Sequence, residues 1–295
     1  MKKLLFLLLL LLFTVASFSF SVVDDLGRVV EIETVPQRIV VAAPAFTDYL
    51  VKLGCADKII GVTDYDMFDA EKIGQMTPLN IEKIISIKPD LIIVAGGFQA
   101  AETYKLEKFG LTVICLNPNT MDAIFRTTTF LATILDVTDK GEEVVADAQN
   151  RMLSVSRDKA YKIPLDERKE VFYAMISGNE VKDLWTCGQG SFLNEVISLA
   201  GGVNITGNYS GSNGWLPLSV EFVASKNPDT ILVPAYYEGG EAAAETTIKA
   251  FSPWKDINAV KNGEIYGIDG NKASYANLQL IDLIEQIYEV LYGEK

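Results

Sequence analysis

The sequence predicts an α/β protein with two three-layer lobes, mainly parallel sheets, one long helix joining the lobes and a ligand cleft between them. Three observations support this prediction. Short apolar runs rich in Val and Ile alternate with segments of helical period, one long segment lacks helix breakers, and a 17-residue segment of the first half recurs in the second. Strand–helix alternation is typical of parallel sheets covered by helices.

The N-terminal residues are typical of a secretory signal peptide. Two lysines precede an apolar run, Leu4 to Phe13, which is shorter than the roughly 20 residues that a membrane span needs. We therefore expect residues 1–21 to be a cleaved signal, cut before Phe20 or before Val22, and the mature chain not to insert into a membrane. The first cysteine, Cys55, lies too far away to carry a lipid. A periplasmic protein without a lipid anchor is expected.

Four strands alternate with three helices before residue 117. The predicted strands are Arg38–Ala42, Ile59–Thr63, Leu91–Ala95 and Thr112–Leu116, and the predicted helices are Thr47–Leu53, Ile81–Ile87 and Thr103–Phe109. About 275 residues remain after signal cleavage, enough for two domains of ordinary size. The predicted boundaries are 22–137 for the N-terminal lobe, 138–162 for the linking helix and 163–295 for the C-terminal lobe.

The linking helix is predicted because residues 139–161 contain no proline. Asp139 and Glu142 have the spacing of a capping box, and the helix should end before Pro164. About 22 residues would extend ~33 Å at the usual helical rise. Strand signals then resume, and an amphipathic helix closes the chain. These later elements are predicted at Val171–Ile176, Thr230–Pro234, Glu264–Gly267 and Asn277–Leu291.

An internal repeat relates residues 78–94 to residues 217–233 at a constant offset of 139, with eight identities in 17 positions. In each copy Asn80 or Ser219 is a good N-cap for a short helix that a Pro-Asp pair ends. Two lobes built on one plan explain this recurrence, and the offset excludes a short-period solenoid.

The repeat places Glu82 and Glu221 in the first turns of two corresponding helices. In a strand–helix–strand unit the helix runs antiparallel to the strands, so both carboxylates should lie at the edge where open α/β sheets bind ligands. A first-turn glutamate also complements the helix dipole, which is the simpler explanation for either one. Their recurrence at matched positions favours contact with a partner that has two-fold symmetry, such as a dimeric membrane transporter.

Composition excludes several classes of function. The chain has 26 basic and 39 acidic residues, a net charge of −13, which makes nucleic acid an improbable partner. Histidine is absent, so Ser-His triads and HExxH zinc sites are excluded. The sequence contains no GxSxG motif, no Walker A loop and no CxxC pair. We therefore expect that the protein is not an enzyme, holds no cofactor and supplies no metal ligands.

The three cysteines, Cys55, Cys115 and Cys187, allow at most one disulfide, and the sequence leaves its existence open. Cys115 lies in an apolar strand-like run, where a buried, unreactive thiol is expected. Surface salt bridges are expected for Arg28, in an N-terminal hairpin, and for Arg126, in a helix-like stretch.

The ordered segments 24–54, 60–62, 81–93, 184–204, 218–233 and 254–269 together resemble the class III periplasmic binding proteins of ATP-binding-cassette importers. This helical-backbone group serves ferric siderophores, haem and vitamin B12. The resemblance implies that Glu82 and Glu221 pair with arginines of the permease. The chain carries Thr47, Asp48 and Tyr49 where relatives often have a Glu, and lacks His, which argues against the zinc and manganese branch.

Loops after the strands should line the cleft, because open α/β sheets collect ligands there. Aromatic and amide side chains dominate these loops, as suits a large organic chelate or macrocycle. The candidate cleft residues are Phe46, Tyr65, Phe68, Phe98, Gln99, Asn117, Trp185, Tyr209, Trp215, Tyr236, Tyr237 and Tyr275. The loop Ser177 to Asn179 is also expected there.

The expected function is delivery of an iron complex, a ferric siderophore or similar chelate, by a monomer to an importer made of a permease dimer and its ATPase. Cobalamin or haem is the alternative ligand within the same type of importer. An enzyme or a sensory module on a similar two-lobed frame is the alternative of another class. The exact ligand and its affinity are beyond the sequence.

Overall fold

The computed structural model describes residues 20–176 and 180–294. The predicted signal peptide, except for Phe20 and Ser21, and the loop Ser177 to Asn179 lie outside the described residues. Backbone contacts divide the chain into two compact units. The first lobe comprises the residues up to Asn117 together with Leu131–Thr138, and the second lobe comprises Pro118–Phe130 and Asp139–Lys295.

The first lobe contains a five-stranded parallel sheet with the strand order β5-β4-β3-β6-β7. Its strands are β3 (Ile39–Val41), β4 (Ile59–Val62), β5 (Glu71–Lys72), β6 (Leu91–Ala95) and β7 (Val113–Leu116), and its helices are α2 (Ala45–Lys52), α3 (Ile81–Ser86) and α4 (Ala100–Glu107). Apart from the edge strand β5, which is charged and exposed, the strands are short, apolar and largely buried, as expected where helices cover both faces. The strands and helices predicted here are confirmed to within three residues at each end.

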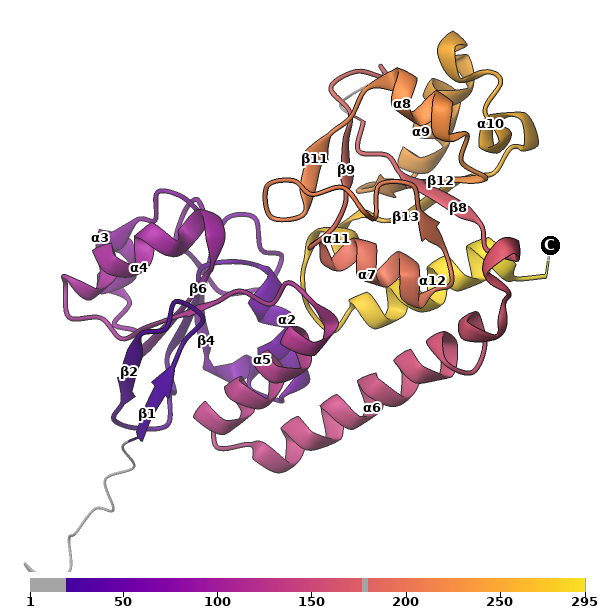
Figure 1. Ribbon diagram of the computed structural model, residues 1–295. Coiled ribbons are helices and arrows are strands. Elements are labelled where there is room, and N and C mark those ends of the chain that lie inside the picture. The colour runs from indigo at the N-terminus through magenta and orange to yellow at the C-terminus, as the bar shows by residue number, and fades with distance from the viewer. Residues whose placement is uncertain (1–19, 177–179, 295) are drawn as a thin grey trace, which may run out of the picture. The chain divides into compact units, whose positions relative to one another are not determined.

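Successive side chains of these strands point to opposite faces of the sheet. Val40, Ile92 and Val94 pack with Ile84 of α3 and Leu106 of α4 in one buried cluster. Figure 1 shows α3 and α4 on one side of this sheet and α2 on the other, which completes three layers.

An antiparallel hairpin of β1 (Phe20–Val23) and β2 (Val29–Ile32) belongs to the same lobe. Arg28, next to its turn, forms ion pairs with Asp24 and Glu107, and its Nη2 donates to the Val113 carbonyl at 3.0 Å. Its side chain is only 12 % exposed. The expectation of a surface salt bridge is therefore wrong for Arg28, because the guanidinium closes the hairpin onto β7. It is confirmed for Arg126, which pairs with Asp122 on the surface.

The second lobe contains a four-stranded parallel sheet with the order β10-β8-β12-β13 and a two-stranded antiparallel sheet of β9 and β11. The strands are β8 (Glu170–Tyr173), β9 (Trp185–Cys187), β10 (Val203–Asn204), β11 (Trp215–Pro217), β12 (Thr230–Ala235) and β13 (Ile265–Asp269). The helices are α7 (Phe192–Leu199), α8 (Val220–Lys226), α9 (Gly240–Ala250), α10 (Asn258–Asn262), α11 (Gly270–Ser274) and α12 (Leu280–Tyr292).

Phe172 and Ile231 of this parallel sheet pack with Val223 of α8, Ile248 of α9 and Trp254 in one core cluster. Helices α7 and α12 lie on the other side of the sheet (Figure 1). The second lobe thus has three layers too, and the predicted fold class is confirmed. The prediction of the strands was less complete here, because β9, β10 and β11 have two or three residues each and were not predicted.

Two further helices follow the first sheet, α5 (Met121–Ile134) and α6 (Thr138–Ser156). At α5 the sequence predicts only a helix-like stretch around Arg126. Helix α6 has 19 residues and starts one residue before the predicted position. It ends at Ser156, earlier than predicted, and a short 3-10 helix, Ala160–Lys162, follows. Apart from Thr138, α6 groups with the second lobe. The division into two lobes and a linking helix at 138–162 stays a prediction.

Candidate functional site

A pocket of about 330 Å³ opens at the carboxyl edge of the second-lobe sheet. Its walls come from the end of β8, from β9 and β11, and from the segments that follow β12 and β13. They are formed by Tyr173, Met175, Trp185, Trp215, Tyr236 and Ser274. This is the edge at which open α/β sheets bind ligands, as the sequence analysis expected.

Aromatic packing holds the base of the pocket. Tyr173, the last residue of β8, is buried, and its ring meets that of Trp215 at 6.1 Å between centroids. On another side Trp215 meets Phe192 at 6.5 Å. Burial raises the pKa of Tyr173 well above its usual value, so its phenol stays protonated. Trp215 is thus fixed by edge-to-face contacts, which are worth about 0.5–1.5 kcal/mol each beyond burial.

Trp185 forms the rim of the pocket. Its backbone N–H donates to the Met175 carbonyl at 3.3 Å and its carbonyl accepts from the Met175 N–H at 3.0 Å. Its side chain nevertheless remains 43 % exposed. A tryptophan whose backbone is fixed and whose ring faces solvent offers an apolar surface with little loss of conformational freedom on binding.

Tyr236 forms the opposite wall. Its hydroxyl lies 3.1 Å from the Ser274 Oγ, and its ring lies over Gly270, where a Cβ would come within 2.8 Å of it. The side chain is half exposed and also borders a second pocket of about 250 Å³, together with Tyr237. Among the described residues, the lining of both pockets contains no charged side chain. They can stack on and hydrogen-bond an uncharged organic surface, but they offer no ion pair.

In the first lobe, the exposed aromatic side chains Tyr65 and Phe98 follow the carboxyl ends of β4 and β6. Asn117, which follows β7, is also exposed, and its N–H donates to Asp25 at 2.6 Å. Phe68 is partly buried, and its N–H donates to the Asp66 carboxylate at 2.9 Å. Four predicted residues therefore lie at the predicted edge of this lobe.

Two predicted cleft residues of the first lobe are instead interior. Phe46 is 1 % exposed, with its ring 6.1 Å from that of Tyr49. Gln99 is fully buried; its amide donates to the carbonyls of Ala42 and Met76 at 2.7 and 2.8 Å and accepts from the Ala95 N–H. Gln99 joins the loops that follow two strands, so its role here is structural. Neither side chain presents a ligand surface, and the assignment of both to a ligand surface is corrected.

The two remaining predicted residues lie outside the aromatic pocket. Tyr209 is packed edge-to-face on Phe222 of α8, with centroids 5.2 Å apart. Tyr275 is partly buried at the end of α11. Sequence reasoning missed Tyr173 and Met175, whereas Ser274 lies in the segment 271–275, which was expected at the cleft. Strand periodicity gave no sign of Tyr173 and Met175, although both lie at or just beyond the end of β8.

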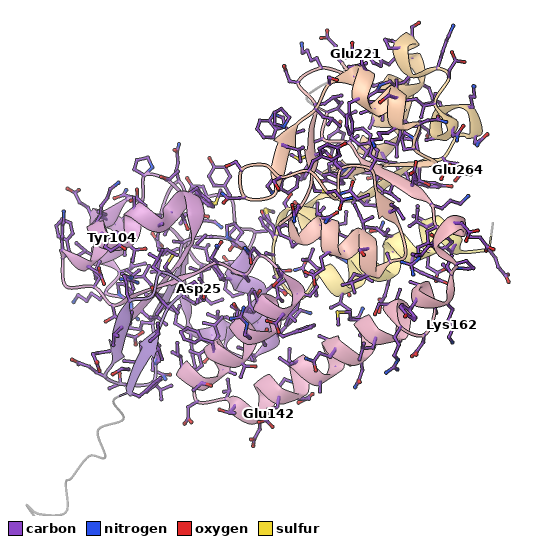
Figure 2. The ribbon with its side chains drawn as sticks, in the orientation of Figure 1. Asp25, Tyr104, Glu142, Lys162, Glu221 and Glu264 are labelled. Atoms are coloured by element: carbon purple, nitrogen blue, oxygen red, sulfur yellow. The ribbon has the colours of Figure 1, made fainter. Side chains whose placement is uncertain are left out.

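The candidate docking carboxylates have the predicted local geometry. The Asn80 side chain accepts from the Lys83 N–H, and the Ser219 side chain accepts from the Phe222 N–H. Glu82 and Glu221 each lie in the first turn that follows, and both are exposed. Figure 2 shows Glu221 at the surface of the second lobe beside α8.

A larger hollow of about 400 Å³ lies elsewhere in the second lobe, beside the ends of α6 and α7. Two arginines border it. Arg168 donates to the Ala160 and Ile163 carbonyls, and Arg157 is paired with Asp158. Because both guanidiniums are engaged in local bonds, this hollow is a weaker candidate for a binding site than the aromatic pocket.

Metal and thiol chemistry have little support in the described part of the chain. Residues 20–176 and 180–294 contain no group of three or more Cys, Asp or Glu side chains placed to hold a metal ion. The three cysteines are buried free thiols, as expected for Cys115. Over the same residues, no helix combines the length and the apolar character that crossing a membrane requires.

A family model described as "Periplasmic binding protein" matches residues 39–271. The chain belongs to this family, and it is a periplasmic binding protein of the type that serves ABC importers. The resemblance inferred from the sequence is thereby confirmed. A small ligand and a permease with its ATPase are the partners that this class implies.

Among curated proteins, the chain is 27 % identical over 286 residues to an uncharacterized ABC transporter substrate-binding lipoprotein, YvrC, of Bacillus subtilis, covering 94 % of this chain and 87 % of that one. It is 26 % identical over 259 residues to the vitamin B12-binding protein of Vibrio cholerae, covering 85 % and 87 %.

Two solved structures show the same fold. The vitamin B12-binding protein BtuF of Vibrio cholerae matches with a TM-score of 0.73 at 26 % identity, over 87 % of this chain and 97 % of that one. The molybdate-binding protein MolA of Haemophilus influenzae matches with a TM-score of 0.78 at 20 % identity, over 92 % and 91 %.

Proposed function

We propose that this chain captures an organic metal chelate of low net charge in the aromatic pocket of its second lobe and delivers it to an ABC permease. The observation that carries the proposal is the lining of that pocket, in which the described residues are four aromatic side chains, one methionine and one serine, with no charged group among them. Such a lining binds by stacking and dispersion, with a few hydrogen bonds for orientation. The predicted cleft between the lobes stays a prediction.

Charge distinguishes the chelates that this pocket suits. A trianionic siderophore complex would meet a chain of net charge −13 and a pocket without a cation. Two chelate classes of low charge remain, the corrinoids and the uncharged ferric chelates. Similarity to a vitamin B12-binding protein supports the first. The exposed phenols of Tyr236 and Tyr237, which can hydrogen-bond chelate oxygens, support the second.

A fluorescence titration tests the proposal. All three tryptophans lie in the second lobe, Trp185 and Trp215 in the pocket and Trp254 in the core. The panel is cyanocobalamin, haem, an uncharged ferric trihydroxamate and a trianionic ferric tricatecholate. We expect saturable quenching by cyanocobalamin or by the trihydroxamate, and none by the tricatecholate.

Trp185→Ala should weaken that binding about 10-fold, because it removes one stacking surface. Phe109→Ala, a change at an exposed aromatic side chain of the first lobe, is the matched control and should leave the affinity unchanged. Binding of the tricatecholate would contradict the argument from charge. Unchanged affinity in Trp185→Ala would remove the pocket from the function.

Export as a free protein is part of the same proposal. Cleavage before Phe20 keeps strand β1 whole, whereas cleavage before Val22 removes the Phe20 and Ser21 pairs with Ile32 and Glu31. We therefore place the cut before Phe20. Cys55 is buried, so it offers no site for a lipid. The intact mass of the secreted protein tests both points, since a mass that includes a diacylglyceryl group or begins at Val22 would contradict them.

The exposed Glu82 and Glu221 are the proposed contacts with the permease. Each lies in the first turn of its helix, and the two helices, α3 and α8, occupy matched positions of the repeat. Because an importer permease is a dimer, two matched carboxylates can pair with the same basic group on each subunit. A monomeric binding protein satisfies this arrangement.

A further inference from the structure

The short helix α11 forms part of the wall of the aromatic pocket. Ser274, its last residue, contacts the Tyr236 hydroxyl, and Gly270, its first residue, lies directly under the Tyr236 ring. The ring can approach the backbone here because Gly270 has no Cβ. The position of Tyr236 therefore depends on the position of α11.

Helix α11 has only five residues and needs outside contacts to hold its place. At its start, the Asp269 side chain accepts from the N–H groups of Asn271 and Lys272 at 3.0 and 3.1 Å. At the helix middle, the Lys272 Nζ donates to the Asp282 carboxylate of α12 at 3.1 Å. The first contact is local, whereas the second joins α11 to the rest of the lobe.

Asp282 is itself held by α6. The Arg151 Nη2 donates to Asp282 at 2.7 Å and to Glu285 at 2.6 Å, and the Arg151 Nε donates to Glu285 at 3.0 Å. Burial alone would raise the pKa of Asp282, but the hydrogen bonds from Arg151 and Lys272 outweigh it and hold the pKa below its usual value. Two cations and two carboxylates thus form a balanced network across three helices.

We propose that Lys272 is a positioning residue for the aromatic pocket. Through Asp282 and Arg151 it fixes α11 against α12 and α6, and so it sets the place of Ser274 and Tyr236 against the ligand. This inference rests on the proposed function for the choice of site. It adds that ligand affinity depends on a charge network outside the pocket lining.

The test compares three variants of the full mature chain. Lys272→Met removes the charge and keeps most of the stem, Lys272→Arg keeps the charge, and Lys249→Met removes a similar exposed pair, Lys249 with Glu245 on α9. The readouts are backbone hydrogen exchange in residues 270–275 and the Kd for cyanocobalamin, or for the ferric trihydroxamate if the wild type binds that instead.

Lys272→Met should speed exchange in residues 270–275 and weaken binding about 3-fold, the effect expected of a partly exposed ion pair. Lys272→Arg should restore both readouts, and Lys249→Met should change neither. Unchanged exchange in Lys272→Met overturns the inference, even if no chelate binds. Faster exchange with unchanged affinity overturns it too, whereas unchanged affinity in Trp185→Ala would overturn the proposed function instead.

Discussion

The two lobes share one frame but differ at the carboxyl edge of the sheet, where we propose that the ligand binds. The strand order β4-β3-β6-β7 of the first lobe corresponds to β10-β8-β12-β13 of the second. Lys88 and Asn227, at matched positions of the repeat, both have φ 50°. Two positions further on, the matched Asp90 and Asp229 accept from backbone N–H groups at the start of the first strand of each sheet. The repeat therefore specifies the same turn and the same strand pairing twice.

The edges differ because the second lobe adds elements that the first lacks. The antiparallel strands β9 and β11 bring Trp185 and Trp215 to the pocket. At the carboxyl edge of the first-lobe sheet, the buried amide of Gln99 instead bonds three backbone groups, those of Ala42, Met76 and Ala95. The comparison teaches that the repeated frame carries the proposed docking carboxylates, whereas the added strands carry the two tryptophans of the pocket.

The largest expected effect concerns the two carboxylates that the lobes carry at matched positions. Reversing both carboxylates, Glu82→Lys with Glu221→Lys, should abolish uptake, because like charges then face the permease at both contacts. Ligand affinity should stay within 2-fold of the wild type, a factor that corresponds to about 0.4 kcal/mol. Uptake into cells or into proteoliposomes that hold the importer is measured beside chelate binding.

The matched control reverses one exposed glutamate of each lobe away from these helices, Glu33→Lys with Glu142→Lys, and should transport normally. Figure 2 shows Glu142 on α6, away from α8. If the docking pair loses ligand binding as well, the carboxylates belong to the ligand site. If one of the single variants, Glu82→Lys or Glu221→Lys, abolishes uptake and the other does not, the two lobes are not equivalent in docking.

A smaller effect, on stability, is expected from the matched aspartates of the two lobes. Asp90→Ala removes acceptors of the Gln37 and Arg38 N–H groups at 2.7 and 2.9 Å. Asp229→Ala removes the acceptor of the Glu170 N–H at 3.0 Å and of a long bond, 3.4 Å, from the Asn258 side chain. At about 1 kcal/mol per backbone N–H bond, with little from the long one, we expect losses of about 2 and about 1 kcal/mol in the free energy of unfolding.

Urea unfolding followed by circular dichroism measures both losses, and tryptophan fluorescence reports the second lobe alone, since all three tryptophans lie there. Asp69→Ala, at an exposed position of the first lobe, is the control and should change little. Equal losses in the two variants would show that the repeated Asp does not act through the number of backbone N–H groups it accepts from.

The smallest effect at neutral pH concerns one buried thiol in each lobe. Burial raises the pKa of Cys115 to about 11 and that of Cys187 to about 12, from an ordinary value of 9.0. Because the folded-state pKa values are raised, their contribution to stability is complete below about pH 9 and is lost as the pH rises through 11 to 12.

A disulfide exchange reagent at pH 8 should therefore modify neither thiol in the folded chain and all three cysteines in urea. As the pH rises, Cys115 should react before Cys187, and the free energy of unfolding should fall above about pH 9. Rapid modification of Cys187 at pH 8 would mean that the second lobe opens locally around it.

The sequence predicted the frame better than the site. Apolar period, caps and Pro-Asp stops are local signals, so the strand at Leu91–Ala95 and the caps at Asn80 and Ser219 could be found from neighbouring residues alone. The sequence predicts ligand contacts at Trp185, Trp215 and Tyr236, because these residues follow strand ends or glycine-rich turns. Phe46 and Gln99 have the same sequence context, and nothing local shows that they point inward.

By itself, the sequence determined the two α/β sheets, their repeat, the acidic surface and the family, because each depends on residue type and spacing. The tertiary structure alone decided which side chains of the edge are exposed. Gln99 is buried because the Ala42 and Met76 carbonyls, both distant in sequence, converge on its amide together with the nearby Ala95 N–H. Tyr236 lines a pocket because a glycine from the next strand–helix junction lies under its ring. Such convergence depends on how separate segments pack, and no single segment encodes it.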